Sequence, residues 1–268
     1  ILVGLGLIMV SWNMSKNMDV IVEEKASFSE IRKSAYQSIF AVLLAVIIFV
    51  GIIGGIFTAT EASAVAVVYA AFVGFFIYRQ LRIKALPTIL ISAARTTASL
   101  SFLIACASLF AWTLAIGKVP EMLTGGLVEF SESVLSLFGS GLDADTSFLM
   151  KKIIILIVLN ISLLFVGMFI DAGPGLLIVV PVVLPISEVI GMDTGLSAVH
   201  FGVLVVSNLI IGLVTPPVGS TLFVASAVGK VGILEMTPYV LKFLVIMIVV
   251  QFLITFVPMI TTLLPSFM

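Results

Sequence analysis

The chain has 268 residues, of which 61% are hydrophobic and only 10% are charged, and its formal net charge is −1. Ordinary soluble domains carry about 25% charged residues, so this composition excludes that class. The near-neutral charge gives no reason to expect a nucleic-acid partner. Several uncharged runs reach the roughly 20 residues with which a helix crosses a membrane. The sequence therefore predicts an all-α, polytopic membrane protein embedded in a lipid bilayer.

Four regions are expected along the chain. The first holds the end of a membrane helix, a polar loop and an interfacial helix. Because it opens inside an apolar stretch, the chain is interpreted as a portion of a longer subunit. The second region holds scaffold-type membrane helices and a cationic connector, the third is a transport-type region, and the fourth is a final membrane helix. The predicted bounds are 1–37, 38–95, 96–238 and 239–268.

The third region is expected to contain a membrane span over 96–117, an acidic loop over 118–152, a helical hairpin over 153–190 and a broken helix over 200–229. The second arm of the hairpin has about 16 apolar residues, or roughly 24 Å of helix, which is short for a full crossing. We therefore expect a re-entrant hairpin. Lys and Arg gather in the connector at 79–95, which places it in the cytoplasm and opens the hairpin outward.

The turn of the hairpin is expected at Gly167–Gly175, where Gly and Pro interrupt an apolar run. Freed backbone groups cannot turn to water in hydrocarbon, so such breaks persist only inside a protein or beside a cavity. Asp171 is the acid of this stretch, and a carboxylate at membrane depth is costly unless paired or solvated. Two roles stay open for Asp171. It either binds a cation or substrate, or it caps the second helix, with Pro174 in the first turn.

A second break is expected at Gly212–Gly219, where Pro216 and Pro217 remove two backbone donors and bar a regular helix before them. Unwound carbonyl groups at Gly212 and Thr215, with the Thr215 hydroxyl, would suit Na⁺, and the helix that restarts beyond them would favour an anion. A simple proline kink is the alternative. Paired broken segments are the best sequence pointer to the binding site of a secondary transporter.

The remaining polar residues of the apolar runs are given structural interpretations. Thr60 is expected to cap a helix that begins at Glu61. Asn160 and Asn208 are expected to form hydrogen bonds across helices. His200 is expected at a membrane interface. With one His and one Cys in the chain, metal or acid–base catalysis has few residues to use.

Three stretches carry a resemblance to the large membrane (M) subunit of tripartite ATP-independent periplasmic (TRAP) transporters. They are Gly54–Tyr69 (GGIFTATEASAVAVVY), Gly167–Pro185 (GMFIDAGPGLLIVVPVVLP) and His200–Ala225 (HFGVLVVSNLIIGLVTPPVGSTLFVA). The resemblance implies an inverted-repeat, elevator-type fold of which one repeat is present here. It also implies Na⁺-driven import of an organic anion, such as sialic acid or a C4-dicarboxylate, across the bacterial inner membrane. The implied partners are a small membrane (Q) subunit and a periplasmic substrate-binding (P) protein.

The same resemblance assigns candidate site residues at the two breaks. For Na⁺ they are Asp171, Gly167, Gly212, Thr215 and Val218. For the substrate they are Gly173, Pro174, Pro216 and Pro217.

Two other functions are weighed against transport. A membrane-embedded enzyme would use Asp171 and Glu61 as an acid–base pair, but about 110 residues separate them and no supporting motif accompanies either. A passive anion channel or a purely structural subunit is the other alternative. Saturable uptake that requires a binding protein would separate a transporter from a channel.

Overall fold

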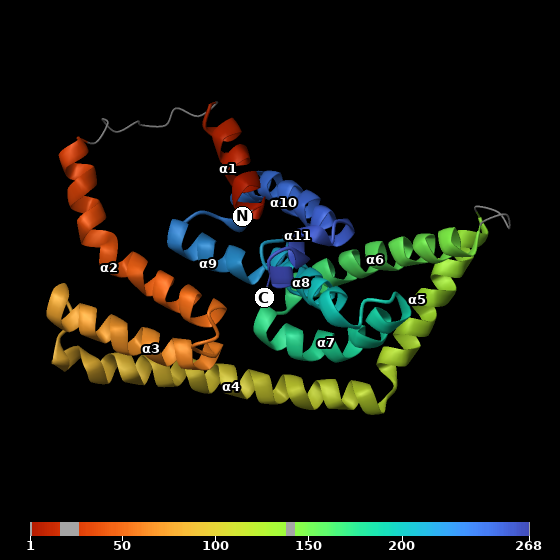
Figure 1. The fold of residues 1–268 in the computed structure, drawn as a ribbon, viewed down its shortest axis with the longest axis horizontal. Helices are drawn as coiled ribbons and strands as arrows, with labels where there is room; N and C mark the ends of the chain where they lie inside the picture. Colours follow the sequence, from red (N-terminus) through yellow and green to blue (C-terminus); the bar gives the residue numbers. More distant parts are fainter. Residues whose placement is uncertain (1, 17–26, 138–142, 268) are drawn as a thin grey trace. The chain divides into compact units, whose positions relative to one another are not determined.

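The computed structural model of the protein describes residues 2–16, 27–137 and 143–267, and all regular elements in these ranges are helical (Figure 1). This confirms the all-α prediction. In chain order the elements are α1 (Leu2–Ser15), α2 (Phe28–Ile53), α3 (Ala59–Phe72), a π-helical turn (Val73–Ile77), a 3₁₀ turn (Ile83–Ala85), α4 (Leu86–Ile116), α5 (Val119–Ser136), α6 (Ala144–Phe169), α7 (Ala172–Val189), α8 (Gly195–Gly212), α9 (Ser220–Gly229), α10 (Ile233–Phe256), α11 (Met259–Thr262) and a 3₁₀ turn (Pro265–Phe267).

Six helical segments of the described residues are long and apolar enough to cross a membrane. A seventh span results if α2 is counted across its 50° bend between Phe28–Tyr36 and Ser38–Ile53. The polytopic class is therefore confirmed. α7 is among the six with 18 residues, and the re-entrant character of the hairpin stays a prediction.

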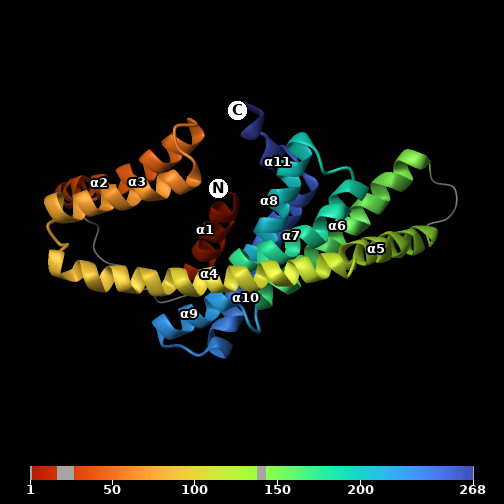
Figure 2. The ribbon, with the colours of Figure 1, turned by 90° about the horizontal axis from the view of Figure 1, so that it is seen from below.

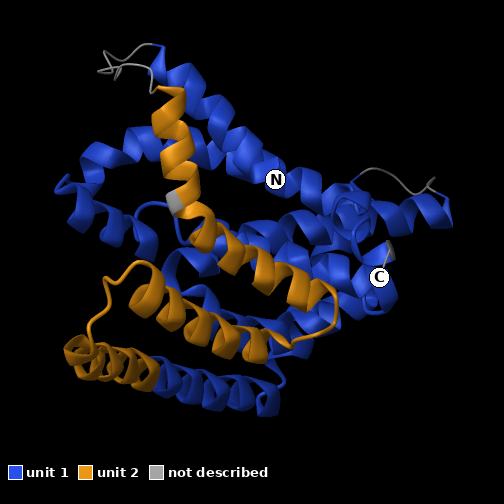
Figure 3. Ribbon diagram, turned by 60° about the vertical axis from the view of Figure 1, so that its left-hand side comes forward, with its two compact units in different colours: residues 1–19, 100–268 blue, residues 20–99 orange. Residues whose placement is uncertain are grey.

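The chain divides into two compact units, coloured separately in Figure 3. One unit comprises residues 20–99, and the other comprises residues 1–19 and 100–268. The second boundary falls inside α4, which runs unbroken for 31 residues. The borders of the four predicted regions differ from these, and those regions stay predictions.

In the smaller unit, α2 packs against α3, and the Tyr69 hydroxyl donates to the Phe40 carbonyl oxygen at 2.9 Å. α3 begins with a capping box. The Thr58 side chain accepts from the Glu61 amide, and a Glu61 carboxylate oxygen accepts from the Thr58 amide at 2.8 Å. The prediction of Thr60 as the cap is therefore wrong by two residues. Thr58 fits because its partner Glu stands three positions later, as this motif requires.

The larger unit is built around α6, α7 and α8. Side chains from these helices and from the link between α7 and α8 form one apolar core, against which α5 packs. α1 packs on α10 in the same unit. The fully buried members of the core include Leu204 and Leu209 of α8. The centre of this unit is therefore the helix that leads into the second predicted break.

The acidic loop predicted over 118–152 is corrected by the structure. α5 and the first turns of α6 occupy most of this segment and lie side by side (Figures 1 and 2), and Lys151 of α6 forms an ion pair with Glu132 of α5 at 2.7 Å. Residues 139–141 of this segment lie outside the described residues. Charged residues do not exclude a helix, because a helix can carry them on one face, as α5 does with Glu121, Glu129 and Glu132.

Two other predicted boundaries move. The cationic connector at 79–95 is largely helical, because α4 begins at Leu86 with Pro87 in its first turn, where proline is tolerated. The predicted final span ends early, because Val257 and Pro258 separate α10 from α11. The predicted border between the first and second regions, at 37–38, coincides with the 50° bend of α2.

Candidate functional site

The first break lies between α6 and α7 and is shorter than predicted. Only Ile170 and Asp171 leave the helical conformation, both with extended backbone angles, so Gly167 lies inside α6 and Gly173 to Gly175 lie in the first turn of α7. Asp171 is the N-cap of α7, and one of its carboxylate oxygens accepts from the Ala172 amide at 3.0 Å. The capping interpretation of Asp171 is therefore confirmed. Its side chain is exposed, so the cap leaves the carboxylate open to a ligand as well.

The second break matches its predicted bounds. α8 ends at Gly212, α9 begins at Ser220, and the seven residues between them are not helical. The bond between Pro216 and Pro217 is cis. The Thr215 amide donates back to the Gly212 carbonyl oxygen at 2.9 Å, and the Thr215 hydroxyl donates to the Ile211 carbonyl oxygen at 3.0 Å. The chain therefore closes a tight turn beyond α8, which is more than a proline kink.

The two breaks are brought together by a contact between two glycines. A Cβ placed on Gly212 would lie 2.6 Å from the Cα of Gly167 and 2.9 Å from the Leu164 carbonyl oxygen. A Cβ placed on Gly167 would lie 2.7 Å from the Leu209 carbonyl oxygen. Real Cβ atoms do not approach backbone so closely, so α6 and α8 can cross here because both positions lack a side chain. This gives Gly167 and Gly212 a packing role that the sequence interpretation did not include.

A backbone hydrogen bond joins the breaks just beyond this contact. The Gly219 amide donates to the Met168 carbonyl oxygen at 3.1 Å. Within the second break, the Thr221 amide donates to the Leu213 carbonyl oxygen at 3.2 Å. Freed backbone groups of the second break are thus satisfied partly by the hairpin and partly by the start of α9, as membrane depth requires.

Gly219 also packs closely against carbonyl oxygens. Its φ of +51° lies in the left-handed region, which favours glycine. A Cβ at this position would lie 2.8 Å from the Leu213 carbonyl oxygen, 3.0 Å from that of Thr215 and 3.2 Å from the Leu222 side chain. Only a residue without a side chain therefore fits here. No hydrogen bond from the described residues reaches the Thr215 oxygen, and a backbone oxygen of this kind is a ligand that suits a hard cation.

The other candidate residues are distributed over the same two breaks. Val218 and Pro216 are half-buried, and Pro217 is exposed. In the first turn of α7, Gly173 is exposed and Pro174 is half-buried. In the described part of the chain, no group of three or more His, Cys, Asp or Glu side chains could hold a metal ion. The candidate ligands for a cation are the backbone oxygens and the Thr215 hydroxyl of the second break and the Asp171 carboxylate of the first.

On the N-terminal side of the glycine contact, α6, α8 and α10 are joined by a buried network of polar side chains. The Asn208 amide donates to the Asn160 side-chain oxygen at 2.7 Å, which confirms the predicted bond across helices. Gln251 and Thr255 of α10 donate to the same oxygen, both at 3.1 Å. These two residues were missed by the sequence interpretation. Their spacing of four residues places two polar side chains on one face of an apolar helix, a signal that could have identified them.

His200 is buried inside the protein, and its expected place at a membrane interface stays a prediction. Its side chain is 2% exposed in the second turn of α8. One ring nitrogen lies 2.7 Å from the Thr261 hydroxyl, and the other lies 3.2 Å from the Thr255 carbonyl oxygen. His200 therefore joins α8 to α10 and α11, because the turn at Pro258 returns Thr261 to the start of α8.

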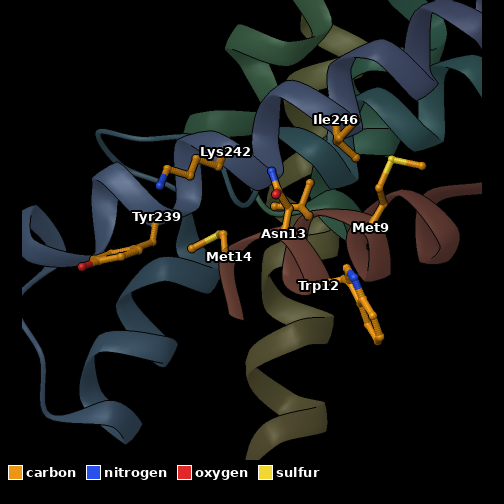
Figure 4. A pocket seen from close by; sticks show the side chains of 8 residues that line it. Met9, Trp12, Asn13, Met14, Tyr239, Lys242 and Ile246 are labelled. Carbon is orange, nitrogen blue, oxygen red and sulfur yellow. The ribbon is translucent and has the colours of Figure 1, made fainter. Parts of the chain in front are cut away.

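A separate hollow of about 780 Å³ lies between α1 and α10 (Figure 4). Lys242 and Tyr239 belong to its wall, with the Lys242 ammonium 5.8 Å from the centre of the Tyr239 ring. The other lining residues are Met9, Val10, Trp12, Asn13, Met14 and Ile246. None of these residues belongs to either break, so the hollow is distinct from the candidate site.

An all-helical fold with several membrane-crossing helices and two adjoining helix breaks defines a membrane-transport class of protein. Comparison with known families agrees. The model of the family described as "Tripartite ATP-independent periplasmic transporter, DctM component" matches residues 1–260. The chain therefore belongs to the DctM family of TRAP transporter large permease proteins.

Individual relatives give the same result. The chain is 33% identical over its whole length to the C4-dicarboxylate TRAP transporter large permease protein DctM of Pseudomonas aeruginosa, and covers 58% of that protein. It is 34% identical over 94% of its length to the 2,3-diketo-L-gulonate TRAP transporter large permease protein YiaN of Escherichia coli, covering 55% of it. It is 33% identical over 98% of its length to the sialic acid TRAP transporter large permease protein SiaM of Vibrio cholerae, covering 56% of it. The chain thus spans little more than half the length of these relatives.

Proposed function

We propose that this chain is part of the permease subunit of a Na⁺-coupled secondary transporter, which imports an organic carboxylate anion delivered by a periplasmic binding protein. The observation that carries the proposal is the close contact between Gly167 and Gly212, which brings the ends of α6 and α8, and with them the two helix breaks, together. In secondary transporters, paired breaks supply backbone carbonyl groups to the coupling ion and helix N-termini to an anionic substrate. Family membership favours this function over the membrane-embedded enzyme.

In the proposed site, Na⁺ is bound by oxygens of the second break and by Asp171 of the first. Gly212, Thr215 and Val218 contribute backbone oxygens to the ion. Gly167 does not bind the ion in this proposal; because it lacks a side chain, it allows α8 to pack closely against α6. The ion would balance the carboxylate of Asp171, whose charge is costly at membrane depth when alone.

The substrate carboxylate is proposed to bind next to the ion. Gly173 and Pro174 border it at the N-terminus of α7, and Pro216 and Pro217 border it from the second break. The N-terminus of a helix carries partial positive charge and unpaired amides, which favour an anion. Binding of Na⁺ offsets part of the negative charge of Asp171 and the substrate, and this lowers the cost of an elevator-type movement through the membrane.

The relatives named for C4-dicarboxylate, diketogulonate and sialic acid transport support an organic acid as the substrate class. The proposed partners are a small membrane (Q) subunit and a periplasmic substrate-binding (P) protein, and the proposed location is the bacterial inner membrane. Because the chain spans about half of its relatives, the remaining half of the site is proposed to come from the rest of the subunit.

The proposal is tested by uptake of a labelled organic acid into proteoliposomes that contain the complete complex and its binding protein. We expect saturable uptake that rises with an inward Na⁺ gradient and collapses when choline replaces Na⁺. Uptake that ignores Na⁺ would refute the coupling. Flux that does not saturate, or that needs no binding protein, would indicate a passive channel.

A further inference from the structure

The buried polar network beside the site is centred on one atom, the side-chain oxygen of Asn160. It accepts hydrogen bonds from Asn208 of α8 and from Gln251 and Thr255 of α10, at 2.7, 3.1 and 3.1 Å. All four side chains are 1–3% exposed. The orientation of the Asn160 amide is fixed, because its nitrogen donates to the Leu156 carbonyl oxygen at 2.7 Å. The opposite orientation would place that nitrogen against the amide nitrogens of Asn208 and Gln251, which are donors themselves.

Asn160 is also the link between two parts of the bundle. α8 and α10 are joined to each other without it, since Ser207 donates to the Gln251 side-chain oxygen at 2.7 Å, and Gln251 donates to the Leu204 carbonyl oxygen at 3.2 Å. His200 adds a third connection through the Thr255 carbonyl oxygen. In the described part of α6, Asn160 alone contributes side-chain hydrogen bonds to α8 or α10. The network therefore attaches the first arm of the hairpin to an α8–α10 pair that is already joined.

The position of this link bears on the candidate site. Asn160 lies seven residues, or about two helical turns, before Gly167, and Asn208 lies four residues before Gly212. The pairs Asn160–Asn208 and Gly167–Gly212 occur in the same order along both helices, so α6 and α8 run in parallel and the two contacts share one interface. The paired glycines allow the close crossing of α6 and α8, and the buried polar pair, whose hydrogen bond forms in one register only, specifies how the helices are aligned along their axes.

We propose that Asn160 is a positioning residue, which fixes the axial register of α6 against α8 and thereby brings the Met168 carbonyl oxygen to the Gly219 amide. A shift of α6 along its axis would break that 3.1 Å hydrogen bond and displace the backbone of the second break beside its carbonyl oxygens. Asn160 thus acts on the ion site from two turns away without touching it.

The structure indicates a variant that removes the link and leaves the other partners of the network in place. In Asn160→Leu, each donor group keeps another acceptor. Asn208 and Gln251 both retain the Leu204 carbonyl oxygen, and Thr255 retains that of Gln251. Ser207→Ala is the matched control, because it removes a bond of the same network between α8 and α10 and leaves α6 untouched.

The first measurement is hydrogen–deuterium exchange by mass spectrometry on the complete permease complex, followed on peptides that cover residues 213–222. We expect Asn160→Leu to speed exchange there by about three- to tenfold. This is the range expected if the hydrogen bond between the Gly219 amide and the Met168 carbonyl oxygen is lost. Ser207→Ala is expected to leave these peptides as in the wild type. Equal protection in the wild type and Asn160→Leu would overturn the proposal.

The second measurement is the Na⁺ concentration at half-maximal uptake, which rests on the proposed function. We expect it to rise in Asn160→Leu and to stay unchanged in Ser207→Ala. If wild-type uptake ignores Na⁺, the proposed function fails, and the exchange measurement still decides the role of Asn160.

A double variant separates register from mere stability. Asn160→Leu with Asn208→Leu removes both partners, so no buried amide on α8 is left without its hydrogen-bond partner. The melting temperature is therefore expected to recover relative to Asn160→Leu alone. Faster exchange at residues 213–222 is expected to persist, because no polar pair then sets the register. If exchange recovers together with the melting temperature, Asn160 is only a stabilising residue. The double variant also serves if Asn160→Leu alone does not fold.

Discussion

The Gly219 amide donates to the carbonyl oxygen of Met168 at 3.1 Å, so the residue that precedes α9 is tied to the last turn of α6. This bond joins the two helix breaks through backbone atoms. It therefore holds the carbonyl oxygens of the second break at a fixed place relative to the hairpin, and does not depend on the flexibility of a side chain. Preorganisation of this kind lowers the cost of binding an ion.

Gly219→Ala is expected to damage the protein in two ways. The left-handed φ of +51° costs a residue with a Cβ about 1–2 kcal/mol, and the methyl group would push against the Leu213 and Thr215 carbonyl oxygens, which would lie only 2.8 and 3.0 Å from it. We expect a lower melting temperature and loss of the additional stabilisation that Na⁺ gives over choline.

The matched control for Gly219→Ala is Gly229→Ala at the other end of α9, where a Cβ meets no atom within 4 Å. It is expected to keep the stabilisation by Na⁺. A Gly219→Ala complex that is stabilised by Na⁺ as fully as the wild type would show that the close packing of Gly219 against these carbonyl oxygens does not matter for the ion site.

Gly212→Ala tests the contact between the breaks. Its Cβ would lie 2.6 Å from the Cα of Gly167, and backbone on both sides cannot yield as a side chain does. We expect a loss of about 1–3 kcal/mol in the free energy of unfolding, as overpacking typically costs, together with loss of uptake. Gly202→Ala in the same helix meets nothing within 4 Å and should be neutral or slightly stabilising. Similar melting temperatures for the two variants would contradict the close crossing.

The two breaks were predictable from the sequence because they depend on local chemistry. Pro216 and Pro217 remove backbone donors wherever they occur, and a carboxylate such as Asp171 in an apolar run is costly in any fold. These rules located the second break at its observed bounds. They overestimated the first, because Gly167 and Gly173 are compatible with helix and only Ile170 and Asp171 leave it.

The pairing between distant residues was not predictable in the same way. That Gly167 meets Gly212, or that Asn160 accepts from Gln251, depends on which helices pack together and in which register. Small and polar residues in a membrane helix indicate that a partner exists but do not identify it. The expectation that Asn160 and Asn208 form hydrogen bonds across helices was correct, but the sequence did not identify them as partners of each other.

Substitutions at Asp171 separate its cap from its proposed role as an ion ligand. Asn caps helices as well as Asp does, so Asp171→Asn should retain the bond to the Ala172 amide and change stability little. Asp171→Ala should lose about 1 kcal/mol with the cap. If the carboxylate binds Na⁺, both variants should need more Na⁺ for half-maximal uptake. An Asp171→Asn complex with the Na⁺ dependence of the wild type would leave Asp171 as a helix cap.

The capping box of α3 gives the last prediction. A Glu61 carboxylate oxygen accepts from the Thr58 amide and hydroxyl at 2.8 and 2.9 Å, so this acid is engaged with its own helix end. Gln serves the same position in capping boxes, and Glu61→Gln should therefore keep both stability and uptake. Thr58→Ala should lower the free energy of unfolding by about 0.5–2 kcal/mol, because the Glu61 amide then loses its acceptor. Thermal melting and uptake of the two variants check this, and a Glu61→Gln complex that melts normally but transports nothing would give the Glu61 carboxylate a direct part in function.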